Sequence, residues 1–203
     1  MAGILGRNIY IAIVAILFFG FASPVYAQKS SLKLSEQTKH YSIKGKTAPQ
    51  FAASMSRRGP YSRQHGRRAW ATATRDMTYQ LFHRKSKGTC RVKAVRVKLK
   101  TTYVLPKLAS KRGVSNQQLK KWNRMYGLLK KHERTHGEFY KQFGRKVYTS
   151  LRKMKPARTC RQLDRNAAAI VARLGAEDKR RNVKFDRRDR RNYRSMERLY
   201  SGA

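Results

Sequence analysis

The chain has 203 residues and carries 49 Lys and Arg against 10 Asp and Glu, which gives a formal net charge of +39 at pH 7. Such a charge repels itself and attracts anions, so it bears on partners and solubility and not on the fold. After the first 27 residues no apolar run is long enough to cross a membrane, which excludes a protein with several membrane spans.

The N-terminus has the features of a secretory signal. An apolar run occupies residues 9–22, Ser23 and Pro24 interrupt it, and the sequence VYA at 25–27 suits a signal peptidase. A retained membrane anchor is the alternative, but a spanning helix needs roughly 20 apolar residues and this run is shorter. We therefore expect a signal peptide at 1–27 and export to the periplasm or the cell exterior. A single domain at 28–203 then has 176 residues and a charge of +38, because Arg7 is removed.

The first half of this domain contains patterns typical of strands. We predict a strand at 38–43, a short helix at 47–56, and two further strands at 70–82 and 95–105. The last two flank a turn at Gly88 and form a predicted antiparallel hairpin with one cationic face.

The second half is predicted to be helical. Ser115 and Gln118 form a capping box, and an apolar stripe with steps of three or four residues continues almost to Pro156. A second helix is expected from Arg161 to about Lys179, followed by a basic C-terminal tail. The fold class is therefore α+β, with a small antiparallel sheet packed on a long helix and on a second C-terminal helix.

The chain has two cysteines, Cys90 and Cys160. In an oxidising compartment an isolated pair forms one disulfide, which we expect here. The alternative is that both ligate a metal, but their spacing from each other and from the histidines does not resemble a zinc knuckle.

The long predicted helix carries the motif H-E-x-x-H at residues 132–136. His132 and His136 are one helical turn apart, so both imidazoles can reach one ion at about 2.0–2.1 Å from each nitrogen. Glu133 is displaced from that pair and can act as general base on a water molecule. The pattern is typical of zinc metalloproteases. The alternative is a polar pair on a solvated helix face, but lysines such as Lys130 and Lys131 already occupy that face.

A catalytic zinc site needs a third protein ligand. The downstream acidic candidates are Glu138, Asp164, Glu177, Asp178, Asp186, Asp189 and Glu197. Asp186 and Asp189 lie among arginines, so simple charge compensation is an equally good explanation for them. His40, His65 and His83 are expected to be ordinary exposed histidines.

Several short stretches together resemble a known family. They are YSIKGKT, SMSRRGP, GRRAWATAT, GTCRV and YVLP, then Trp122 ahead of HERTHG, and finally RTCRQL. In their order and spacing the chain resembles the bacterial secreted zinc-dependent proteases, catalogued as a domain of unknown function in the zincin-like peptidase group. The resemblance implies a zincin-like α+β fold, zinc on His132 and His136, Glu133 as catalytic acid and base, and a disulfide.

The chain departs from this family near its end. Relatives tend to have Tyr-Asp followed by Thr-x-His-Gly, where this chain reads FDRRDRRN. Asp186 matches the Asp, Asp189 stands at the Thr position and Arg191 at the His position. If that His is a ligand in relatives, Asp186 or Asp189 must replace it, and we assign Asp186 as the third zinc ligand.

The leading hypothesis is an exported zinc metallopeptidase that cleaves a peptide or protein substrate and is held near an anionic cell envelope by its basic surface. The rival hypothesis is a non-catalytic cationic protein that binds anionic envelope polymers on the same scaffold. Nucleic-acid binding ranks lowest, because few aromatic residues are interleaved with the basic segments.

Overall fold

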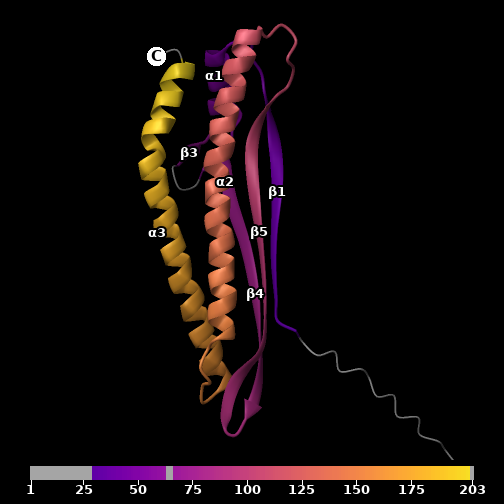
Figure 1. Ribbon diagram of the computed structural model, residues 1–203, viewed down its shortest axis with the longest axis vertical. Helices are drawn as coiled ribbons and strands as arrows, with labels where there is room; N and C mark the ends of the chain where they lie inside the picture. The colour runs from indigo at the N-terminus through magenta and orange to yellow at the C-terminus, as the bar shows by residue number, and fades with distance from the viewer. Residues whose placement is uncertain (1–28, 63–65, 202–203) are drawn as a thin grey trace, which may run out of the picture.

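The computed structural model describes residues 29–62 and 66–201 and has eight elements (Figure 1). The expected signal peptide at 1–27 and His65 lie outside the described residues. The elements are β1 (Ser31–Ile43), α1 (Ala48–Arg58), β2 (Tyr61–Ser62), β3 (Arg67–Arg68), β4 (Thr72–Ser86), β5 (Thr89–Leu108), α2 (Asn116–Arg152) and α3 (Cys160–Ser201). No helix in the described part of the chain is long and apolar enough to cross a membrane.

The main sheet has three strands in the order β1-β5-β4 and is mixed. The predicted hairpin is confirmed, since β4 and β5 pair antiparallel from Thr72↔Val104 to Ser86↔Thr89. The prediction of a purely antiparallel sheet was wrong, because β1 runs parallel to β5. A parallel neighbour requires a long crossover connection, here through α1 and β4, and local strand patterns carry no information about such a connection.

Two long antiparallel helices lie along the sheet, with α2 next to the strands and α3 on its outer side (Figure 1). The predicted start of α2 is confirmed, since the Ser115 side chain accepts a hydrogen bond from the backbone N–H of Gln118. The apolar stripe of α2 packs into the core between sheet and helices. Its buried apolar members are Trp122, Met125, Leu129, Phe143, Val147 and Leu151.

Helix α3 continues for 42 residues, so the prediction of a helix ending near Lys179 with a basic tail was wrong. Its buried positions include Leu163, Ala167, Leu174, Asp178 and Asn182, which are spaced by four or seven residues and so share one face. Arginine and lysine favour the helical conformation, and the inner face that begins with apolar residues continues with Asp178 and Asn182, which bind Arg75 and His136. The charged segment after Lys179 was therefore not predicted as helix, because its inner face is polar and shows no apolar stripe.

The expected disulfide is confirmed: Cys90 and Cys160 are bonded, with a Cα–Cα distance of 5.1 Å. It joins the start of β5 to the start of α3, and Cys90 also pairs through its backbone with Ala157. Both sulfur atoms are therefore bonded to each other, and the cysteines do not form the alternative metal site.

Candidate metal centre

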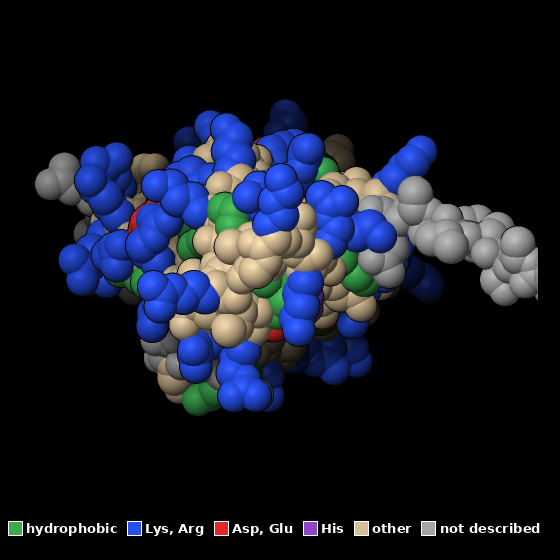
Figure 2. All heavy atoms as spheres, turned by 90° about the horizontal axis from the view of Figure 1, so that it is seen from below, with side chains coloured by type: hydrophobic (Ala, Val, Ile, Leu, Met, Phe, Trp, Pro, Cys, Tyr) green, Lys and Arg blue, Asp and Glu red, His purple; other side chains and the backbone are tan. Residues whose placement is uncertain are grey.

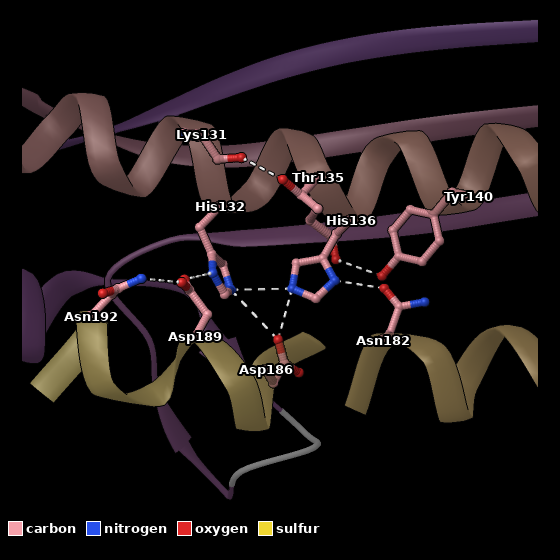
Figure 3. A network of polar contacts seen from close by, with 10 residues as sticks. Lys131, His132, Thr135, His136, Tyr140, Asn182, Asp186, Asp189 and Asn192 are labelled. Carbon is pink, nitrogen blue, oxygen red and sulfur yellow. Dashed lines mark hydrogen bonds and ion pairs between the residues drawn. The ribbon is translucent and has the colours of Figure 1, made fainter. Parts of the chain in front are cut away.

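The H-E-x-x-H motif lies near the middle of α2, on the side that faces α3 (Figure 3). His132 and His136 are one turn apart and their Nε2 atoms are separated by 3.2 Å. His136 is buried and His132 is half-buried. The helical spacing thus places both imidazoles on one face, as the sequence indicated.

Helix α3 presents a carboxylate to this pair. Asp186 Oδ1 lies 2.9 Å from His136 Nε2 and 3.5 Å from His132 Nε2. Two nitrogens and one oxygen from three side chains therefore converge on one point, within reach of a single ion. The expected third residue is brought to the histidine pair, whereas Asp189 lies at the opposite edge of the His132 ring (Figure 3).

The other nitrogen of each imidazole is held by an oxygen of α3. His132 Nδ1 lies 2.6 Å from Asp189 Oδ2, and His136 Nδ1 lies 2.6 Å from Asn182 Oδ1. Asn182 Nδ2 donates to the backbone oxygen of Asp178, which fixes the amide so that its oxygen faces His136. Both rings therefore donate from Nδ1, and both Nε2 atoms face Asp186, where each can carry either a proton or a metal ion.

The electrostatics of the cluster favour a cation between these three groups. Burial raises the pKa of the Asp186 carboxyl, but its hydrogen bonds to His132 and His136 outweigh burial and hold that pKa well below its usual range. Burial lowers the pKa of each imidazole, but Asp186, Glu133 and the Nδ1 partners outweigh it and raise both. The geometry and charges of the cluster therefore stabilise a positive charge between these three groups.

Glu133 is buried beside the histidines and touches the sheet. The backbone N–H of Ala73 in β4 donates to its carboxylate, and burial raises its pKa despite the two nearby imidazoles. The backbone oxygen of Ala73 accepts from the Tyr140 hydroxyl at 3.2 Å. Burial raises the pKa of Tyr140 to about 12, so its hydroxyl remains a donor at neutral pH. Ala73 thereby holds the catalytic candidate on α2 to the edge strand of the sheet.

A cleft of about 720 Å³ opens onto these groups. One wall is the backbone segment 69–73, which leads into β4, and the other is α3. Its lining residues are Ser56, Ser62, Arg67, Arg68, Ala69, Trp70, Ala71, Thr72, Ala73, His132, Glu133, His136, Tyr140, Asn182, Asp186, Arg190 and Arg194. A polymer segment can therefore approach the cluster along β4.

The sequence did not indicate three of the residues that organise the site, namely Asn182, Ala73 and Tyr140. Asn182 had a usable signal, since it lies four residues before Asp186 and shares its helical face. The contacts of Ala73 have no local signal, because they depend on how β4 packs against α2. His40 and His83 are exposed, as expected.

The chain is thus an α+β protein with a mixed three-stranded sheet, three helices in the described residues, and a cluster of two histidines and one carboxylate at the junction of two long helices. Residues 38–193 match the family described as "Bacterial protein of unknown function (DUF922)", and the chain belongs to this family. The matched region contains every residue of the cluster. No curated protein and no solved structure matches the chain.

Proposed function

We propose that this protein is an exported zinc-dependent peptidase with a zincin-like arrangement of its H-E-x-x-H helix. The observation that carries the proposal is the convergence of His132 Nε2, His136 Nε2 and Asp186 Oδ1 next to the buried carboxylate of Glu133. Asp186 is about 50 residues away from the H-E-x-x-H motif in the sequence. Their meeting in space is therefore not explained by a chance match to a short local motif.

The donor set fits zinc. The three acceptor atoms are 2.9, 3.2 and 3.5 Å apart. Ligand atoms at about 2.0–2.1 Å from a tetrahedral zinc are separated by about 3.3 Å, which lies within that range. Two histidines and one carboxylate are also a ligand set that catalytic zinc uses, with the fourth position left for water. The hydrogen bonds at both Nδ1 atoms supply the orientation that metal-binding histidines need.

Hydrolysis would use Glu133 as the proton carrier. The chemistry that zinc supplies when bound is Lewis acidity, which lowers the pKa of water and polarises a carbonyl group. Glu133 takes one proton from the attacking water as the new C–O bond forms. It then returns that proton to the amide nitrogen as the C–N bond breaks. Its raised pKa suits both steps, because the group must accept and then release a proton near neutral pH.

The substrate would be an extended peptide in the cleft. An extended peptide can pair with the backbone of an edge strand, but at Ala73 both backbone groups already bind Glu133 and Tyr140. We therefore place the peptide in the cleft beside segment 69–72, ahead of Ala73 on the same wall. The Ala69 N–H already donates to the Pro60 oxygen and the Trp70 oxygen accepts from the Tyr41 hydroxyl, so the peptide would contact this wall mainly through side chains and not through a continuous strand pairing. Export to the periplasm or beyond is supported by the disulfide, which persists in oxidising compartments.

A second candidate is a non-catalytic protein that binds anionic envelope polymers. The observation in its favour is the surface seen in Figure 2, on which Lys and Arg side chains are spread over the whole visible end of the molecule with very few acidic ones. Binding through such a surface needs neither Glu133 nor a metal, and would weaken steeply with salt. Nucleic acid would be bound by the same surface charge. The described residues show no set of aromatic side chains on which its bases could stack.

Metal analysis of the purified mature protein, combined with a peptide-hydrolysis assay, separates these functions. We expect about one zinc per chain in the wild type, its loss in His132→Ala, and its retention in His40→Ala, an exposed histidine outside the cluster. Glu133→Gln should keep the zinc and lose about 10²–10⁴-fold in hydrolysis rate. A wild type without bound metal, or a Glu133→Gln variant as active as the wild type, would contradict the peptidase proposal.

A further inference from the structure

One face of α3 runs through the site and changes its chemistry along the way. Asn182, Asp186, Arg190 and Arg194 are spaced by four residues, and all four line the cleft. Residues four apart on a helix share a face with only a slow drift. The first two contact the H-E-x-x-H histidines, and the same face continues as arginine.

The opposite wall also ends in arginines. Arg67 and Arg68 form β3, and both line the cleft. Arg68 Nη1 donates to the backbone oxygen of Gly59 at 2.7 Å, which holds that guanidinium in place. Arg67, Arg190 and Arg194 are exposed, and within the described ranges none of these three forms an ion pair with an acidic side chain. The acidic groups of the cleft are Glu133 and Asp186, both engaged in the site itself.

The arginines of α3 lie on one side of the reacting centre. A helix rises about 1.5 Å per residue, so Arg190 and Arg194 are about 6 and 12 Å beyond Asp186 along the axis. Asn182 lies about 6 Å away in the other direction, next to Tyr140 in Figure 3. An extended peptide advances about 3.3 Å per residue. The two guanidinium groups would therefore meet substrate side chains about two to four residues from the scissile bond, on one side only.

We infer that the cleft selects peptides with an acidic side chain two to four residues from the scissile bond, on the side that lies toward Arg190 and Arg194. This inference rests on the proposed peptidase function. A guanidinium binds a carboxylate through two parallel hydrogen bonds, which gives position as well as attraction. The net charge of the protein attracts acidic peptides as well, but it cannot distinguish between the two sides of a cleaved bond.

The test uses synthetic fluorogenic peptides that differ only by Glu or Gln at single positions before or after the bond that mass spectrometry identifies as cleaved. For the wild type we expect kcat/KM to be at least about tenfold higher for Glu than for Gln on one side, which corresponds to about 1.4 kcal/mol. The doubly substituted variant Arg190→Gln/Arg194→Gln should bring this ratio close to one while cleavage of the Gln peptide persists.

The matched control is Lys184→Gln/Arg188→Gln. These two exposed residues also lie four apart on α3, two positions from Asn182 and Asp186, and therefore on the far side of the helix. This variant removes the same charge and should keep the preference. Equal loss in both double variants would reduce the effect to net charge and overturn the inference, as would equal preference on both sides of the bond or none.

Binding distinguishes this inference from the proposed function. Glu133→Gln should turn peptides over about 10²–10⁴-fold more slowly, so the fluorescence anisotropy of the Glu and Gln peptides can be compared in that background with and without the Arg190→Gln/Arg194→Gln change. Cleavage without a preference for the Glu peptides would overturn this inference but would leave the proposed peptidase function intact. If no peptide is cleaved but the Glu peptide binds in a way that depends on Arg190 and Arg194, the peptidase function is overturned. The conclusion that these arginines bind an acidic ligand then remains.

Discussion

The side-chain oxygen of Asn182 accepts a hydrogen bond from Nδ1 of His136 at 2.6 Å, and both residues are buried. This contact fixes which nitrogen of the ring carries the proton and leaves Nε2 for a metal. Because such partners of ligating histidines are worth about 10–100-fold in metal affinity, we expect Asn182→Ala to weaken zinc binding by that factor.

Chelator competition on the purified protein measures this effect. Asn166→Ala is the control, since Asn166 is an exposed asparagine of the same helix that contacts Gln162 and not the site. An affinity that is unchanged in Asn182→Ala would show that the contact does not orient the ring.

Gly137, directly after the second histidine, is required by a close contact with the sheet. A Cβ at this position would lie 1.8 Å from the Tyr103 hydroxyl oxygen, which donates to Glu36 at 2.7 Å. We therefore expect Gly137→Ala to lower the free energy of unfolding by at least about 1–3 kcal/mol, measured by urea titration. Gly127→Ala in the same helix meets nothing within 4 Å. It should stabilise by roughly 0.5–1 kcal/mol, because alanine favours the helix, and equal effects of the two changes would contradict this explanation.

The ion pair between Arg75 and Asp178 joins β4 to α3 in a largely buried place. Their atoms are 2.7 Å apart, the Asp178 side chain is 6% exposed, and the Arg75 guanidinium lies 4.0 Å from the centroid of the Phe143 ring. Removing one partner of a buried pair leaves an uncompensated charge, so Asp178→Ala should cost about 3 kcal/mol of unfolding free energy.

An exposed pair on the same helix provides the comparison. Arg173 and Glu177 are also 2.7 Å apart but are more exposed to solvent, with side-chain exposures of 62% and 37%. Glu177→Ala should therefore cost less than about 0.5 kcal/mol. The same urea titration measures both variants, and a similar loss in the two would mean that burial does not set the strength of the Arg75 pair.

Glu36 should make stability depend on pH in the acid range. Burial raises the pKa of this carboxyl, but hydrogen bonds from Lys141 and Tyr103 and the charges of Lys141 and Arg134 outweigh it and hold that pKa below its ordinary value. A lowered folded-state pKa gives stability that is present above the unfolded pKa of about 4.3 and is lost as the pH falls through the folded value.

The measurement is the Tm of the wild type and of Glu36→Gln at pH 7 and near pH 3. The wild type should be the more stable at pH 7, and the difference should shrink on acidification. Glu177→Gln, at a partly exposed position of α3, should change Tm little at either pH. A Glu36→Gln difference that stays constant between the two pH values would rule out this titration as its source.

The sequence alone determined the features that lie within a single helix or a single hairpin. The spacing of His132 and His136 places two imidazoles on one face whatever surrounds the helix, because i and i+4 are always neighbours. The Ser115 cap and the hairpin around Gly88 are equally local, and both are found. The second half of the predicted capping box is not formed, because the Gln118 side-chain oxygen accepts from the backbone N–H of Ala48 in α1. The pairing of Cys90 with Cys160 followed from their number and not from any calculation of distance.

What the tertiary structure alone decided is everything that joins distant segments. Residues 179–194 were interpreted as a basic tail, yet they continue α3 and carry Asp186 and Asp189 to the histidines. The parallel position of β1 and the contacts of Ala73 with Glu133 and Tyr140 were also beyond local patterns. The physical reason is that periodicity fixes which side chains share a face, whereas the partner of that face is selected by the packing of the whole core.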